Sequence, residues 1–178
     1  KKKKIIREKL NIVDKFITSK NLKSDRYYNN FFDNKRYIYT PTFVNLKFAD
    51  TIDCIKRMDS KKYILKYHYL SLLDLIYSFT YLFRIKKLIL NKYKFNNINI
   101  YSFIKKEFYN FKNINAILLG IQNYLFIKKL KEKKIKINKF INWFENSNVD
   151  KGYNFGLSSF FPKIKTYGYQ GFFVEKEW

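Results

Sequence analysis

The stretch IKINKFINWFENSNVDKGYNFGLSSFFPKIKTYGYQGFFV, residues 135–174, decides the fold class. Its first ten residues have the composition and length of a strand. The segment NVDKGYNFGLSSFF then carries apolar side chains at helical spacing and ends before Pro162, and KTYGYQGFFV is again strand-like. A strand, a helix and a strand joined by short loops form a βαβ unit with two parallel strands. We therefore predict an open, mainly parallel α/β sheet with flanking helices, Rossmann-like, in which residues 137–144 and 166–174 are neighbours.

Upstream of this unit, the sequence predicts a less regular series of elements. RYIYTPTFVNL, residues 36–46, is rich in β-branched and aromatic residues, which favours a strand broken at Pro41. DTIDCIKRMDS, residues 50–60, is typical of a short amphipathic helix capped by Asp50 or Thr51. The remaining expectations are loosely helical spacing over residues 1–24, a polar aromatic loop over 25–36, a long helix from about Tyr69 to Asn91, a strand or helix over 98–111 and a helix over 114–134.

Length and composition indicate one globular domain. The chain has 178 residues, of which 47% are hydrophobic and 21% aromatic, so it can bury a substantial core. Its formal net charge of +23 first suggests a nucleic-acid-binding protein. However, the basic residues are 32 Lys and only 5 Arg, and Arg is the residue that reads guanine and phosphate bidentately. We attribute the excess of Lys to an AT-rich genome. We expect Lys to be spread over the surface and expect no specific nucleic-acid partner.

The chain has one cysteine and one histidine, which limits the metal sites and catalytic groups that it can form. Cys54 cannot form an intramolecular disulfide, and we expect it to be a small buried residue. His68 leaves no histidine cluster for a metal ion and no obvious His-centred triad. We therefore expect no metal site.

The start of the chain and its longest apolar run indicate how the domain is organised and whether it can span a membrane. The chain opens with KKKK and its only Met is Met58, so we expect residues 1–178 to be a single α/β domain and a fragment of a longer protein. The longest run without charge, residues 113–127, is too short to span a bilayer. We expect a cytoplasmic protein with peripheral contact at an anionic inner membrane.

Polar residues gather where the first strand of the βαβ unit ends. Ligands of open α/β sheets bind beyond the carboxyl ends of the strands, and Glu145 and Asn146 lie at such an end. Asp150 and Lys151 fall in the first turn of the following helix, whose free N–H groups suit an anionic group. Glu145 is a candidate general base or ligand for sugar hydroxyls. A purely structural role is an alternative for both carboxylates. Glu145 can be a surface charge, and Asp150 can be a favourable charge at a helix N-terminus.

The second strand of the unit ends in YGYQGFF, residues 167–173. Gly168 and Gly171 would let a backbone or a ligand approach the strand end closely. The same two glycines are compatible with a β-bulge. If the βαβ prediction is right, this strand end lies beside the one that carries Glu145, so residues far apart in the chain converge there.

The segment NWFENSNVDKGYNFGLSSFFPKIKTYGYQGFF, residues 142–173, resembles a segment of bacterial surface-carbohydrate (capsule or lipopolysaccharide O-antigen) biosynthesis proteins that are similar to GT-B glycosyltransferases. The shared pattern is a strand ending in aromatic-Glu-Asn, a helix with a charged start, and a strand ending near GYQGF. Family members often have Gln after Glu-Asn, where this chain has Ser147. The match rests on Trp143, Phe144, Glu145, Asn146, Asp150, Lys151, Asn154, Gly156, Pro162, Gly168, Tyr169, Gln170, Gly171 and Phe172.

This resemblance implies the N-terminal, acceptor-side half of a GT-B-like glycosyltransferase of cell-surface polysaccharide biosynthesis. Glu145 would be the catalytic base. The nucleotide-sugar donor would be held by a second domain, the acceptor would be a glycan or a lipid-linked sugar, and the chemistry would need no bound metal. Two alternatives stay open: a lysine-rich RNA- or ribosome-associated binding protein, and a glycosyltransferase relative that has lost activity. The residues implied to bind substrate are Asn146, Asp150, Lys151, Gly168, Gln170 and Gly171.

Overall fold

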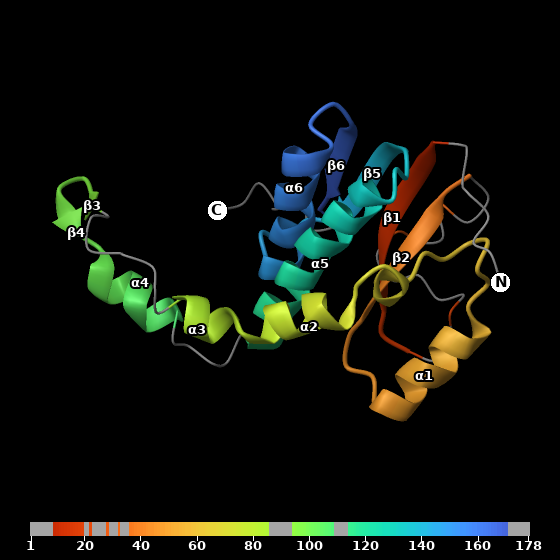
Figure 1. The fold of residues 1–178 in the computed structure, drawn as a ribbon, viewed down its shortest axis with the longest axis horizontal. Helices are drawn as coiled ribbons and strands as arrows, with labels where there is room; N and C mark the ends of the chain where they lie inside the picture. The colour runs from red at the N-terminus through yellow and green to blue at the C-terminus, as the bar shows by residue number, and fades with distance from the viewer. Residues whose placement is uncertain are drawn as a thin grey trace, which may run out of the picture.

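Four parallel strands form one open sheet. The computed structural model describes residues 9–19, 22, 28, 32, 36–85, 94–108 and 114–170. Helices lie against this sheet and beyond its edge (Figure 1), so the predicted fold class, a mainly parallel α/β sheet with flanking helices, is confirmed. In spatial order the strands are β2 (Ile38–Phe43), β1 (Leu10–Ile17), β5 (Ile137–Trp143) and β6 (Lys165–Tyr169).

Strand β5, helix α6 (Asn148–Phe160) and strand β6 form the predicted βαβ unit. The two strands are parallel, with Lys139 opposite Lys165 and Trp143 opposite Tyr169. Helix α6 ends two residues before Pro162, since the residue that precedes a proline is disfavoured in the α region. Residues 171–174 of the second predicted strand lie outside the described residues.

Strand β1 occupies a segment for which helical spacing was predicted, and that prediction is wrong. β1 lies between β2 and β5, so both of its faces are covered. Ile12 and Val13 are adjacent in the chain, point to opposite faces and are both fully buried. A strand buried on both faces carries consecutive apolar residues in place of alternating ones. The alternating pattern by which a strand is recognised in a sequence is therefore missing from β1. Of the loop predicted over residues 25–36, only 28, 32 and 36 are described.

Strand β2 runs through Pro41, where a break was predicted. The backbone N–H of Tyr39 donates to the Lys62 carbonyl and its own carbonyl accepts from Ile64, both at 2.8 Å. Tyr39 therefore bonds on the side away from β1, and Pro41, two residues later, faces the same way. Its missing N–H costs the β1–β2 pairing no hydrogen bond, which is why a proline is tolerated there.

Two of the predicted helices are confirmed. Helix α1 (Phe48–Arg57) carries Cys54 as its buried residue, although the N-cap is Lys47 and neither Asp50 nor Thr51. Helix α5 (Ile114–Glu132) covers the predicted segment and ends in basic residues, which favours the negative end of its dipole.

The long helix predicted from Tyr69 to Asn91 is instead two short ones, α2 (Leu72–Phe79) and α3 (Tyr81–Ile85), preceded by a 3-10 turn, η1 (Lys66–His68). The break falls at Thr80, whose hydroxyl donates to the Tyr77 carbonyl and so competes with the helical backbone bonds. The 98–111 segment contains both predicted alternatives. Strands β3 (Lys94–Phe95) and β4 (Ile98–Asn99) form a hairpin, and α4 (Tyr101–Phe108) follows.

Helices α5 and α6 pack together on one face of the sheet through two glycines. A Cβ added to Gly152 would lie 2.0 Å from the carbonyl oxygen of Gly120, so any side chain there would force the helices apart. This close approach brings the apolar sides of both helices onto β1 and β5. The main core is made of Leu10, Ile12, Ile64, Leu70, Leu125, Phe126, Ile127, Leu130, Ile137, Phe140, Tyr153 and Leu157.

The opposite face of the sheet is covered by aromatic side chains. Tyr28 and Phe32 pack edge to face, at 5.3 Å between ring centroids, and the Tyr28 ring also contacts Trp143. Val13, Tyr39 and Ile141 complete this second cluster. Both sides of the central strands are thus removed from water, which is the main stabilising contribution to such a sheet.

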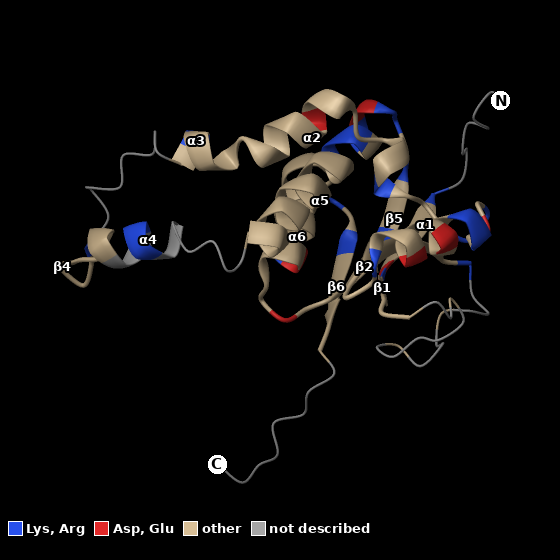
Figure 2. Cartoon of the chain, turned by 90° about the horizontal axis from the view of Figure 1, so that it is seen from below, with Lys and Arg blue, Asp and Glu red and all other residues tan. Residues whose placement is uncertain are grey.

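Within the described part of the chain, basic side chains occur in several separate elements. Lys and Arg positions lie in α1, in α4, in the last turn of α5 and on the strands (Figure 2). Within the described ranges, no helix combines the length and the apolar character that a bilayer crossing requires.

Candidate functional site

The carboxyl ends of β1 and β5 form the topological switch point of the sheet. After β1 the chain passes to β2 on one side, and after β5 it passes through α6 to β6 on the other. Ligands of open α/β sheets bind where two such connections diverge. Glu145 and Asn146 lie in the connection directly after β5, so this part of the predicted site occupies the position that the topology favours.

Trp143, the last residue of β5, connects the ends of two strands. Its indole N–H donates to the Glu145 carboxylate (Nε1 to Oε1, 2.5 Å), and its ring packs against that of Tyr169, 5.4 Å between centroids. The N–H of Phe144 donates to the Tyr169 carbonyl at 2.9 Å. Trp143 is buried, Glu145 is exposed and Tyr169 is 45% exposed. One buried indole therefore contacts both an exposed carboxylate and a half-exposed aromatic ring.

The start of α6 separates the predicted residues into exposed and buried ones. Asn146 is exposed and adopts a left-handed conformation with φ 58°, which Asn tolerates better than most residues. Lys151 is exposed in the first helical turn. Asp150 is 1% exposed and accepts a hydrogen bond from the Ser147 hydroxyl at 2.5 Å. Glu145, Asn146 and Lys151 thus face solvent, while Asp150 points into the protein.

The end of β6 carries the remaining predicted residues. Gly168 lies against the Phe144 side chain, and an added Cβ would come within 2.9 Å of the Phe144 Cβ. The group that approaches this glycine closely is therefore a neighbouring side chain. Gln170 is exposed directly after the strand, and Gly171 lies outside the described residues. Whether Glu145, Asn146, Asp150, Lys151, Gly168, Gln170 and Gly171 contact a substrate stays a prediction.

A second group of polar side chains lies between the sheet and helices α5 and α6, and of its members the sequence had pointed only to Asp150. The Thr42 hydroxyl donates to Asp14 at 2.9 Å. The Lys66 ammonium donates to Asn123 Oδ1 at 2.6 Å, and Asn123 Nδ2 donates to the Val149 carbonyl at 3.0 Å. These side chains are almost completely shielded from solvent. We call this group the buried polar cluster, and its members are Asp14, Thr40, Thr42, Lys66, Asn123, Asp150 and Tyr153.

Burial dominates the electrostatics of this cluster. It raises the pKa of Asp14 from 3.8 to about 7, opposed by the positive charge of Lys66 and the Thr42 hydrogen bond and reinforced by the nearby Asp150. Burial lowers the pKa of Lys66 from 10.5 to about 8, opposed by Asp14. It also raises the pKa of the Tyr153 hydroxyl, and Asp14 adds to that. In each case the protein disfavours the charged form, as expected for groups removed from water.

The buried polar cluster is only partly hydrogen-bonded within the described residues. Asp14 Oδ2, Thr40 Oγ1, Asp150 Oδ2 and the Tyr153 hydroxyl have no hydrogen-bond partner there, although Tyr153 lies close to Thr40. Such groups are costly in a folded protein. The cluster is closed to solvent, so it can influence the exposed loop after β5 only by fixing the position of the neighbouring helix. Asn123 does this through its hydrogen bond to the Val149 carbonyl at the start of α6.

A sequence signal for this cluster exists in retrospect. Asp14 stands inside the strand LNIVDKFI, and Lys66 stands among apolar and aromatic residues in YILKYHYL. Charged residues are almost never fully buried unless they are paired. A charged residue within an apolar run, such as Asp14, which Lys15 follows in β1, therefore predicts polar partners elsewhere in the core.

Comparison of the chain with protein-family models, with curated proteins and with solved structures finds no match. Among the described residues there is no group of three or more His, Cys, Asp or Glu side chains arranged to hold a metal ion.

Proposed function

We propose that the chain is the acceptor-side domain of a GT-B-like glycosyltransferase that acts in cell-surface polysaccharide biosynthesis. The observation that carries the proposal is the exposed Glu145 carboxylate, fixed by Trp143 beside the half-exposed ring of Tyr169 at the switch point of the sheet. A carboxylate accepts hydrogen bonds from sugar hydroxyls, and an aromatic ring offers the apolar surface on which a sugar ring can pack. The resemblance of residues 142–173 to surface-carbohydrate biosynthesis proteins supports the same assignment.

In this proposal Glu145 is the general base. Its carboxylate takes the proton from the acceptor hydroxyl as that oxygen attacks the anomeric carbon of the donor sugar and the nucleoside phosphate leaves. The hydrogen bond from Trp143 restricts the carboxylate to one orientation, which lowers the entropy cost of aligning base and acceptor. Asn146 and Gln170 would bind further hydroxyls.

Lys151 would bind an anionic part of the acceptor or donor. It lies in the first turn of α6, where the backbone N–H groups and the helix dipole also favour negative charge. The nucleotide-sugar donor would be held by a second domain, and the acceptor would be a glycan or a lipid-linked sugar at the cytoplasmic side of the inner membrane.

The test uses the protein expressed from its complete reading frame. Consumption of UDP-glucose, UDP-N-acetylglucosamine, GDP-mannose and dTDP-rhamnose is followed with a lipid extract of the source organism as acceptor. We expect turnover of one donor to fall by roughly a hundredfold or more in Glu145→Gln. Glu132→Gln is the matched control, because Glu132 is an exposed glutamate in the last turn of α5, paired only with Lys128 and Lys129 among the contacts observed.

Two results would overturn the proposal. One is full turnover by the Glu145→Gln variant. The other is an absence of turnover with every donor together with tight, sequence-selective RNA binding at physiological salt, which would favour the RNA-binding alternative. Absence of turnover without RNA binding would favour the inactive glycosyltransferase relative.

A further inference from the structure

Helices α2 and α3 expose an unusually apolar surface. Four side chains are more than half exposed: Leu72 at 72%, Leu73 at 75%, Phe79 at 61% and Phe83 at 68%. Ile76 and Tyr77 are each about half exposed, at 49%. We call these six residues the apolar arm face. Large contiguous apolar patches are rare on soluble monomers and mark surfaces that bind another molecule or a membrane.

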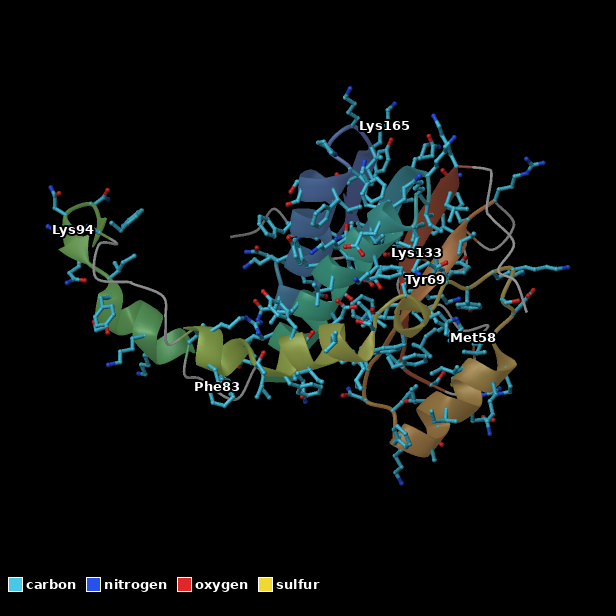
Figure 3. The ribbon with its side chains drawn as sticks, in the orientation of Figure 1. Met58, Tyr69, Phe83, Lys94, Lys133 and Lys165 are labelled. Carbon is cyan, nitrogen blue, oxygen red and sulfur yellow. The ribbon has the colours of Figure 1, made fainter. Side chains whose placement is uncertain are left out.

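The orientation of α2 is fixed by its other side. The Ser71 hydroxyl and the Asp74 carboxylate form a capping box, and Asp74 also pairs with Lys129 of α5 at 3.6 Å. Leu75 packs against the main core and Ser78 is buried. Since this side is occupied, the apolar arm face is held outward. Figure 1 shows α3 extending α2 away from the sheet, and Figure 3 shows Phe83 on the outer side of α3.

The surroundings of the apolar arm face are basic. The described part of residues 72–108 carries the basic residues Arg84, Lys94, Lys105 and Lys106, while its acidic Asp74 is paired with Lys129. The Arg84 guanidinium lies over the Tyr77 ring, 3.7 Å from its centroid, so a cation adjoins the apolar face directly. Lys105 and Lys106 are exposed on α4. Leu, Phe and Tyr next to Lys and Arg are the composition of segments that lie in a membrane interface.

We propose that the apolar arm face docks on an anionic lipid bilayer. Its leucine and phenylalanine side chains enter the region between headgroups and acyl chains, while the neighbouring Lys and Arg contact lipid phosphates. A second copy of the chain fits less well, because each copy would bring the same positive charge to the contact and few acidic groups to balance it. This inference deepens the proposed function, since lipid-linked acceptors lie at a membrane. Vesicle binding needs no sugar, however, so its failure would leave glycosyl transfer untouched.

The test is flotation of the 178-residue chain with vesicles of phosphatidylglycerol and phosphatidylcholine, against vesicles of phosphatidylcholine alone. We expect binding to the anionic vesicles that weakens as salt rises. Phe83→Ser should weaken it by about tenfold or more, because burial of a phenylalanine side chain is lost. The matched control is Phe48→Ser. Phe48 is 82% exposed on α1, a helix separate from α2 and α3 (Figure 1), and its replacement should leave binding unchanged.

A double variant, Leu73→Ser/Phe83→Ser, provides a stronger test. Both side chains are exposed, so thermal unfolding should match the wild-type chain while vesicle binding disappears. The proposal is wrong if these variants float as well as the wild type, or if Phe48→Ser weakens binding as much as Phe83→Ser. It is also wrong if light scattering shows a dimer that Phe83→Ser dissociates and the wild-type dimer does not bind vesicles.

Discussion

The exposed loop after β5 and the buried polar cluster lie next to each other but follow opposite rules. The loop carries Glu145 and Asn146 in contact with solvent, and the cluster holds Asp14 and Lys66 out of reach of it. Asp150 belongs to both, since it follows the loop in sequence and turns its carboxylate inward. Polar residues near a strand end can therefore serve chemistry or architecture, and burial separates the two roles. Changes in the loop should alter activity, and changes in the cluster should alter stability.

The largest expected effect on stability is that of Lys66→Met. The change removes the donor to Asn123 and leaves Asp14 buried without its cation. Removing the partner of a buried polar group costs about 1–3 kcal/mol, and more where that group is charged, so we expect a loss of about 3 kcal/mol or more in the free energy of unfolding above pH 7, where Asp14 is ionised. Urea denaturation measures this cost, and it should shrink at low pH, where Asp14 is protonated. Lys163→Met, at an exposed lysine, should change stability by less than about 0.5 kcal/mol. Equal effects of the two variants would contradict the assignment of Lys66 to the buried polar cluster.

Stability should also depend on pH through the cluster. The folded pKa of Asp14, about 7, exceeds the ordinary value of 3.8, so between pH 4 and 7 the folded state binds more protons than the unfolded state. The free energy of unfolding should therefore fall as the pH rises through this window, by up to about 4 kcal/mol. Asp14→Asn should flatten the fall. A wild-type profile that rises with pH over this range would show that Asp14 is not protonated on folding.

The second half of the pH profile depends on Lys66. Its folded pKa of about 8 is below the ordinary 10.5, so between pH 8 and 10.5 the unfolded state binds the extra proton. Stability should rise with pH in that window. The two windows together predict that the cluster contributes least to the free energy of unfolding near pH 7 to 8. Urea denaturation at a series of pH values can locate this minimum.

A smaller loss of stability is expected for Gly152→Ala, at the contact between α6 and α5. Gly152→Ala would put a Cβ 2.0 Å from the Gly120 carbonyl oxygen, and such overpacking typically costs about 1–3 kcal/mol. Because α6 starts at the loop, its displacement should lower activity as well as stability. Thermal unfolding and turnover measured together check this. An alanine variant with unchanged stability would mean that the two helices are not in backbone contact.

The smallest change in stability is expected for Glu145→Gln. The glutamate is exposed and keeps the length of its side chain in the variant, so the free energy of unfolding should change by less than about 0.5 kcal/mol. Denaturant unfolding of the variant and the wild type compares them directly. A loss above about 2 kcal/mol would place Glu145 with the structural residues.

The sequence predicted the part of the fold where local patterns and tertiary contacts agree. The βαβ unit has short loops, a helix before Pro162 and strand-like flanks, and the structure confirms it. β1 was missed because both of its faces are buried, so that alternation is absent. The length of α2 was missed because apolar spacing continues past Thr80, while the break depends on a local side-chain hydrogen bond.

The candidate site likewise has a part that the sequence could predict and a part that it could not. Glu145, Asn146 and Lys151 could be placed at the strand end from topology alone, since the loop follows β5 directly. The electrostatic interaction of Asp14 with Lys66 and the hydrogen bond from Asn123 to the Val149 carbonyl join residues far apart in the chain. No spacing rule connects such residues, so only the packed structure brings them together.

The most direct test of the account compares Glu145→Gln with Asp14→Asn in the same sugar-transfer assay, each expressed from the complete reading frame. Turnover is divided by the folded fraction, which circular dichroism gives for each variant. We predict that Glu145→Gln remains folded and loses roughly a hundredfold or more of its turnover, while Asp14→Asn shifts stability and keeps its turnover per folded molecule. The reverse pattern, with full turnover in Glu145→Gln and lost turnover in folded Asp14→Asn, would contradict the division between a functional loop and a structural cluster.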